Sequence, residues 1–190
     1  MPAAWLPDRF GRPTNSWRMA ILPYLQSGDI FNSLNYSFTW DSAENQTTRN
    51  TKMATFLRPE AAGNDEPITK FFAVVGPPTP FPDAVNLKFD DIRDGLSTTI
   101  MFGEVAESDT LWAEPRDLRL GTMDFRVNGP VKARSFGSPY GGARALLMDG
   151  SVISLLDSTH PSVVRALVTA NCGEVLEGEA PHWKLGTPPR

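Results

Sequence analysis

Five carboxylates and one tryptophan lie within a short acidic segment of the chain. They are Glu104, Glu107, Asp109, Trp112, Glu114 and Asp117. Two facing carboxylates can serve as general acid and general base, and an aromatic platform beside them suits a sugar ring. The segment therefore indicates a carbohydrate-binding or glycoside-cleaving site built on Glu104, Trp112, Glu114 and Asp117. The same pattern also fits a solvated loop whose strand-terminal Glu accepts a backbone hydrogen bond.

A second acidic cluster precedes Gly95 and contains Asp90, Asp91 and Asp94. Several oxygen ligands from one loop are what Ca²⁺ requires, so these three side chains are candidate metal ligands. The alternating Asp spacing of calcium loops is missing, however, and Asp commonly caps turns. We therefore expect turn capping here, with no bound metal and no cofactor.

Nucleophilic and zinc chemistry find little support in the sequence. His160 and His182 are the two histidines, and Cys172 is the single cysteine. A zinc site needs three or four such ligands at suitable spacing, and no Gly-x-Ser-x-Gly motif provides a serine nucleophile. A Cys172–histidine pair stays open, although the end of an amphipathic helix favours a small buried residue there. The absence of a coherent catalytic set favours a non-enzymatic protein.

A hairpin between residues 141 and 158 is the element around which we expect the chain to be organised. Asp149-Gly150 stands between two apolar runs, which is the signal for a two-residue type I′ turn. That turn places the pair Leu147/Val152 on one face and the pair Leu146/Ile153 on the other. Both faces then carry apolar side chains, which predicts a sheet covered on both sides.

The remaining elements are short and separated by proline-rich loops. Ser16 is the expected N-cap of a helix that Pro23 interrupts and that continues to residue 35. A helix is also expected after His160-Pro161, with Thr159 as its N-cap and Gly173 beyond its end. The other predictions are a polar helix over 43–52, strands over 53–57, 70–75 and 97–105, a helical turn over 90–95, and loops over 58–69 and 76–91.

Composition sets the class of protein. The chain has 190 residues, 41% of them hydrophobic, with a formal net charge of -4. This length suits one domain, which we place at 1–175, followed by a tail at 176–190. The acidic balance argues against a nucleic-acid surface, and no apolar run reaches the roughly 18 residues of a membrane span. We predict an α+β fold, loop-rich, with an antiparallel β-sheet and N-terminal and C-terminal helices packed on it.

Six segments occur in a characteristic order over roughly residues 4–175: SWRMAILPYLQ, WDSAENQ, FFAVVGP, DIRDGLSTTIMFGE, WAEPRDL and GGARALLMDGSVISLL. Together they resemble the pseudopilin-like proteins of planctomycete bacteria known as domain of unknown function 1559. That family is also described as prepilin-type processing-associated, with a His-x(9)-Asp-Gly pattern. The resemblance implies a pseudopilin-like, type II secretion-like structural domain of the cell envelope or periplasm. It also implies protein partners or self-association.

Two features depart from the family pattern. Family members begin with a prepilin leader and a long apolar helix, and no such segment precedes Met1. We expect either the soluble part of a longer protein or a paralogue that lost its anchor, which leaves open a cytoplasmic subunit of a larger assembly. Pro139 occupies the place of the family histidine, and Leu57-Arg58-Pro59-Glu60 stands where members carry Cys-Pro-Ser-Asp.

These considerations predict where a partner binds. If the chain is an assembly module, its partner surface should be apolar and lie on the sheet face that the missing helix would cover. Val152 and Ile153 lie in that sheet and are the natural positions at which to probe it.

Overall fold

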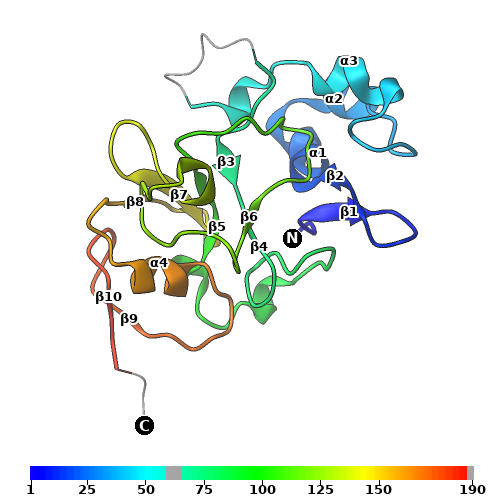
Figure 1. Cartoon of the computed structure of the whole chain (residues 1–190). Coiled ribbons are helices and arrows are strands. Elements are labelled where there is room, and N and C mark those ends of the chain that lie inside the picture. Colours follow the sequence, from blue (N-terminus) through cyan, green and yellow to red (C-terminus); the bar gives the residue numbers. More distant parts are fainter. Residues whose placement is uncertain (59–65, 188–190) are drawn as a thin grey trace.

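A central four-stranded antiparallel sheet positions the rest of the chain in the computed structural model, which describes residues 1–58 and 66–187 (Figure 1). Its order is β3-β5-β7-β8, with bounds Phe71–Phe72, Ile100–Glu104, Ala143–Leu147 and Val152–Leu155. The predicted mixture of antiparallel sheets and helices is confirmed, and the helices are few and short. Pro59 and Glu60, named above for their departure from the family pattern, lie outside the described residues.

The N-terminal part is a hairpin followed by short helices. Strands β1 (Trp5–Pro7) and β2 (Pro13–Ser16) pair antiparallel and lead into α1 (Trp17–Ile21). The hydroxyl of Ser16 accepts from the Arg18 amide at 3.2 Å, which confirms the predicted N-cap. Pro23 converts the helix into the 3₁₀ turn η1 (Leu22–Leu25), as its missing amide requires, before α2 (Gly28–Ser33) begins.

Two predictions for the next segment need correction. The polar helix is broken into η2 (Ala43–Asn45) and α3 (Gln46–Arg49), and Ser42 caps η2 without a side-chain hydrogen bond. The strand predicted over 53–57 is wrong, because Ala54–Phe56 form a 3₁₀ turn (η3). Phe56 and Met53 are buried there, so apolar packing rather than strand pairing accounts for the run of hydrophobic residues.

The strand predicted over 70–75 is divided between two sheets. β3 pairs antiparallel with β5, whereas β4 (Val74–Val75) pairs parallel with β6 (Leu118–Arg119). Between them, the Ala73 amide donates to the carboxylate of Asp117 at 2.9 Å instead of to a strand. Three further 3₁₀ turns, η5 (Phe89–Asp91), η6 (Leu96–Thr98) and η7 (Lys132–Arg134), lie in the connecting loops.

The central hairpin forms where it was predicted, but its register is shifted by one residue. Leu147 donates to the carbonyl of Ser151 at 2.8 Å, and Gly150, at φ 88°, donates to the carbonyl of Leu147 at 3.0 Å. The connection is therefore a three-residue loop with Gly in the left-handed position, rather than a type I′ turn. Leu146 pairs with Val152 and Ala145 with Ile153.

This register buries one face of the sheet and leaves the other only partly covered, since Phe102 stacks on Trp17 whereas Val152 is exposed, so the prediction of a sheet covered on both sides fails at β8. Ile153 is 7% exposed and Val152 is 65% exposed. Shifting the pairing by one residue moves every side chain of a strand to the opposite face of the sheet. The predicted and the observed pairing of the hairpin therefore differ in which side chains they bury.

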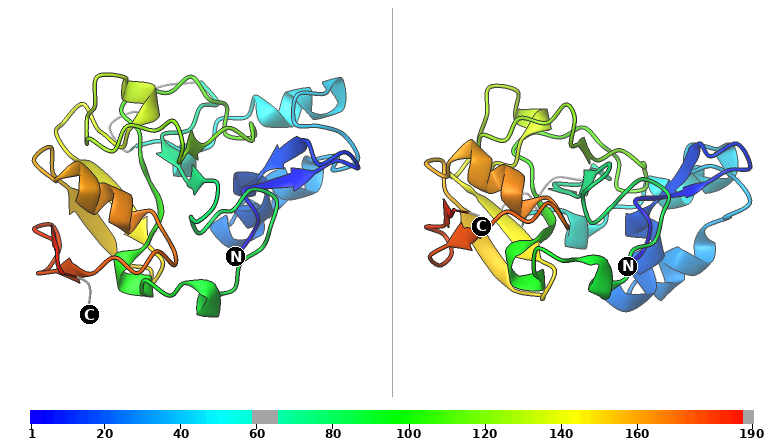
Figure 2. Two further views of the ribbon diagram at one scale, coloured as in Figure 1. Left: turned by 60° about the horizontal axis from the view of Figure 1, so that its bottom comes forward. Right: turned by 90° about the horizontal axis from the view of Figure 1, so that it is seen from below.

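The inner face of the sheet packs against helix α4 (Pro161–Leu167), which lies across β7 and β8 (Figure 2). Gly103 allows the ring of Phe136 to approach, since a Cβ there would lie 2.8 Å from that ring. The N-cap of α4 is His160, whose Nδ1 accepts from the Ser162 amide at 3.3 Å. Thr159, the predicted N-cap, instead accepts from the Leu156 amide.

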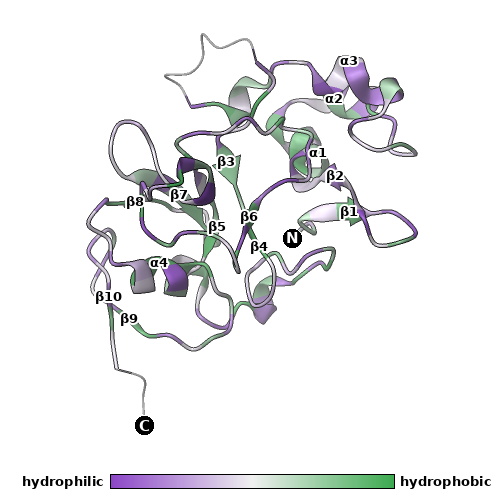
Figure 3. Ribbon diagram, viewed as in Figure 1, coloured by the Kyte–Doolittle hydropathy of each residue, from purple (hydrophilic) through white to green (hydrophobic). Residues whose placement is uncertain are grey.

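The segment predicted as a tail carries structure in its described part. Strands β9 (Leu176–Glu177) and β10 (Lys184–Leu185) form a hairpin, and Leu176 and Trp183 pack against the core of the sheet. Figure 3 shows hydrophobic residues along α1, β4 and β5 and hydrophilic ones along α3. Among the helices of the described residues, none has the length and hydrophobicity that a membrane span requires.

Replacing Gly150 with Val should cost about 2 kcal/mol of stability, because a β-branched residue is strained at positive φ. The site itself is open, with no atom within 4 Å of an added Cβ, so backbone strain alone is tested. Gly121→Val is the matched control, since its surroundings are equally open and its φ lies outside the left-handed range. Equal unfolding midpoints in urea for the two variants would contradict the assigned loop geometry.

Candidate functional site

Asp117 is a buried structural anchor rather than a surface carboxylate. Its Oδ1 lies 2.7 Å from Nη2 of Arg18, and the two side chains are 2% and 0% exposed. The carboxylate also accepts from the indole of Trp17 and from the amide of Ala73. Arg18 additionally donates to the carbonyl of Phe71 and to the hydroxyl of Ser16. Asp117 thus joins α1, the β3–β4 junction and the segment before β6.

Burial changes the proton affinity of both partners. Desolvation raises the pKa of Asp117 and lowers the pKa of Arg18, while the ion pair and its hydrogen bonds oppose both shifts. Sequence reasoning missed Arg18, and its one signal is a charged residue inside the apolar run Trp17-Arg18-Met19-Ala20-Ile21. A carboxylate committed to these partners is unavailable as an acid or base.

Trp112 and Glu114 do not form a sugar-binding site with Asp117. Trp112 is 0% exposed, donates to the carbonyl of Thr51 at 3.0 Å and stacks on Phe56. It cannot offer a face to a ligand, so its prediction as an aromatic platform is wrong. Glu114 pairs at 2.9 Å with Arg116, which also pairs with Asp109. Glu107 and Asp109 line a cavity of about 300 Å³ together with Asp117 and three arginines.

Glu104 fulfils the expectation of a strand-terminal Glu bonded to the backbone. It ends β5, is 6% exposed, and its Oε2 accepts from the Arg144 amide at 2.9 Å. Glu104, Glu114 and Asp117 therefore have different partners, which are the Arg144 amide, Arg116 and Arg18.

The acidic cluster near Gly95 and the turn carboxylate have structural contacts. Asp91 accepts from the Lys88 amide, and Asp94 accepts from the amides of Cys172 and Gly173 at 2.9 and 2.8 Å. Hydrogen bonds from the hydroxyl and amide of Ser151 lower the pKa of Asp149. Within 1–58 and 66–187, no group of three or more His, Cys, Asp or Glu side chains is placed to hold a metal.

Cys172 differs from its prediction as a buried helix-end residue. It is exposed, beyond the end of α4, and desolvation raises the pKa of its thiol. A raised pKa leaves less thiolate at neutral pH, so the geometry does not favour a nucleophile here.

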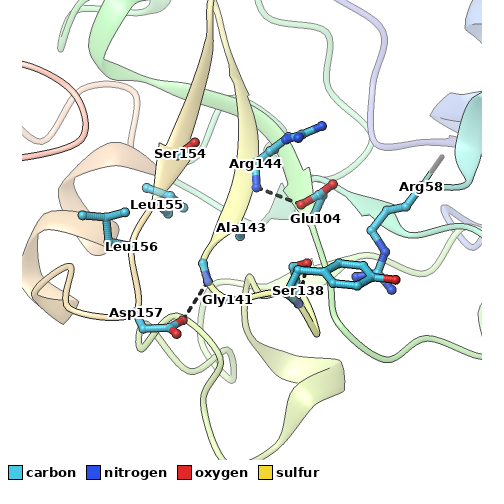
Figure 4. A pocket seen from close by; sticks show the side chains of 12 residues that line it. Arg58, Glu104, Ser138, Gly141, Ala143, Arg144, Ser154, Leu155, Leu156 and Asp157 are labelled. Carbon is cyan, nitrogen blue, oxygen red and sulfur yellow. Dashed lines mark hydrogen bonds between the residues drawn. The ribbon is translucent and has the colours of Figure 1, made fainter. Parts of the chain in front are cut away.

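A cavity of about 470 Å³, here called the Arg58 cavity, lies at the ends of β5, β7 and β8 (Figure 4). Arg58, Glu104, Tyr140, Arg144 and Asp157 contribute its polar side chains, together with Ser138. Asp157 is fixed by the amide of Gly142 and the side chain of Asn128, which lower its pKa. Sequence reasoning did not identify this site.

A second hollow lies on the partly covered face of the sheet and is apolar. This outer groove, of about 390 Å³, is lined by half-buried Phe71, Phe102 and Leu146 and exposed Val152, together with Thr55 and Leu57. Glu104 and Arg144 line both hollows. The arrangement offers an apolar contact surface next to a polar cavity.

Removing the carboxylate of Asp117 should be strongly destabilising. We expect Asp117→Ala to lower the free energy of unfolding by about 3–5 kcal/mol, because Arg18 is left charged and buried without its partner. Asp109→Ala breaks an exposed pair and should cost less than about 1 kcal/mol. Urea unfolding measures both variants.

A double variant, Arg18→Met with Asp117→Ala, should lose less free energy of unfolding than the sum of the losses of Arg18→Met and Asp117→Ala alone. Similar losses for Asp117→Ala and Asp109→Ala would contradict the structural role.

The comparisons with known proteins bear on the N-terminal part of the chain. No curated protein and no solved structure gives a significant match. Residues 1–81, which contain β1, β2, α1 and Arg58, match the family described as "Protein of unknown function (DUF1559)", and it is this family that the chain is shown to resemble.

Proposed function

We propose that the chain is a non-enzymatic interaction domain that self-associates through the outer groove, as a pseudopilin-like structural component of the bacterial cell envelope. The observation that carries the proposal is Val152, 65% exposed on the sheet beside Phe102 and Leu146. Phe102 and Leu146 are half-buried and extend the apolar surface around Val152, and contiguous apolar surface on a globular protein commonly marks an interaction site. The match to a family of unknown function is compatible with this role.

The edge strand of the described sheet adds unpaired backbone amides to the same surface. In the described part of the chain, β8 pairs with β7 and with no other strand. Because Leu147 donates to Ser151, the alternation of an antiparallel ladder directs the amides of Val152 and Ser154 away from β7. An open edge strand next to an apolar groove suits the same edge of a second copy, related by a two-fold axis.

The carbohydrate alternative lacks a comparable observation. It required an exposed Trp112 beside two facing carboxylates, whereas Trp112 is buried and Asp117 is ion-paired with Arg18. The acidic segment is engaged in packing and ion pairs, and we therefore favour the interaction domain.

Val152→Asp is the variant that tests the proposal. The wild-type chain should show concentration-dependent association in sedimentation equilibrium, and Val152→Asp should weaken it about tenfold or more, since a charge would enter an apolar contact. Ile153→Asp is unsuitable, because Ile153 is 7% exposed and a buried charge would unfold the protein.

Val85→Asp is the matched control, because Val85 is also exposed but lies in the loop before η5. It should associate like wild type, and both variants should keep the wild-type melting temperature. A strictly monomeric wild-type chain would overturn the proposal, and so would equal association of the Val152 and Val85 variants.

A further inference from the structure

Two arginines are buried in the described part of the chain, and their hydrogen bonding differs. Arg18 directs its guanidinium donors to Asp117, Ser16 and the carbonyl of Phe71. Arg58 is only 7% exposed, yet among the described residues its guanidinium donates from Nη2 to the carbonyl of Ala106 alone, at 3.3 Å. Its Nε and Nη1 are buried, and within residues 1–58 and 66–187 nothing accepts a hydrogen bond from them. Burying such donors unpaired is costly, which leaves them available to an acceptor from outside the described part of the chain.

The Arg58 side chain lines the 470 Å³ cavity, and Figure 4 shows it entering from the side opposite β8. Glu104 lines the same cavity, and its Oε2 is held by the Arg144 amide. Within the described residues, no hydrogen bond is made to its Oε1, and no ion pair joins Arg58 to Glu104 or to another carboxylate. Arg58 and Glu104 thus carry opposite charges and line the same cavity, but they form no ion pair with each other.

The charged side chains that line the cavity determine which charged ligand fits it. Arg58 and Arg144 are balanced by Glu104 and Asp157, so the lining is close to neutral. A dianion such as phosphate would be repelled by two carboxylates, whereas a molecule carrying one carboxylate and one ammonium group matches the separated charges. Leu155, Leu156 and the ring of Tyr140 leave an apolar wall for a side chain.

We propose that the Arg58 cavity binds a small zwitterion, an α-amino acid, whose carboxylate accepts from Arg58 and whose ammonium group donates to Glu104. The volume lies within the range of small-molecule sites and exceeds what a small amino acid fills, which leaves room for a side chain and water. This binding does not depend on self-association through the outer groove.

Amide chemical shifts of Gly141, Gly142 and Arg144 report on the cavity directly, because these residues line it. ¹⁵N-labelled protein is titrated with L-alanine, N-acetyl-L-alanine and L-alaninamide, each against an equal concentration of NaCl. L-alanine should give saturable shifts. N-acetyl-L-alanine, without the ammonium group, should bind about tenfold more weakly, and L-alaninamide, without the carboxylate, should give no saturable shift.

Arg58→Gln should weaken L-alanine binding by about tenfold or more, because it removes the charged donor. Arg93→Gln is the matched control, since Arg93 is exposed and does not line the cavity, and it should bind like wild type. Val152→Asp should also bind L-alanine normally, which separates this proposal from the proposed self-association.

Glu104→Gln provides an independent test if Arg58→Gln fails to fold, as judged by its melting curve. It should weaken L-alanine binding and leave N-acetyl-L-alanine binding unchanged. The proposal is overturned if L-alanine gives no saturable shift in the wild type, if a folded Arg58→Gln variant binds it equally well, or if L-alaninamide or N-acetyl-L-alanine binds as tightly as L-alanine.

Discussion

The buried ion pair between Arg18 and Asp117 is the constraint on which the arrangement of the N-terminal half depends. Each charge is desolvated, so neither is tolerated in the interior without the other. The pair brings α1, the β3–β4 junction and the segment before β6 to one point, and Trp17 then packs on Phe81 and Phe102 around it. The division of the 70–75 strand between two sheets follows from the Ala73 amide donating to this carboxylate.

The same constraint explains why the acidic segment could not be interpreted from its residue types. Spacing alone shows that Trp112 and Asp117 are close in sequence to other carboxylates, but it does not show which of them point inward. Asp117 takes its partner 99 positions away, at Arg18, and Trp112 donates to Thr51, 61 positions away. Local patterns correctly indicated a strand-terminal Glu104 and a turn-capping Asp91, because those contacts are either backbone-directed or between near neighbours.

The central hairpin shows where sequence-based prediction reaches its limit. Both a two-residue loop and a three-residue loop place Gly150 at positive φ, so Asp-Gly locates the turn without choosing between them. The choice is associated with distant contacts: Met148 donates to the Thr99 carbonyl and packs with Ile92 and Ala170, and Asp149 donates to the Leu96 carbonyl. Because these contacts are long-range, the register, and with it the partly covered face that carries Val152, could not be predicted.

Arg18 and Arg58 illustrate how a buried charge in a structure can indicate either packing or binding. Both side chains are almost entirely withdrawn from solvent, and the sequence segments in which Arg18 and Arg58 stand do not show how each is hydrogen-bonded. Arg18 is saturated by acceptors of the chain, so its burial stabilises one arrangement of the elements. Arg58 borders a cavity with donors unpaired and a carboxylate nearby that does not reach it. The difference lies in hydrogen-bond satisfaction, a property of the folded chain that residue type and spacing do not encode.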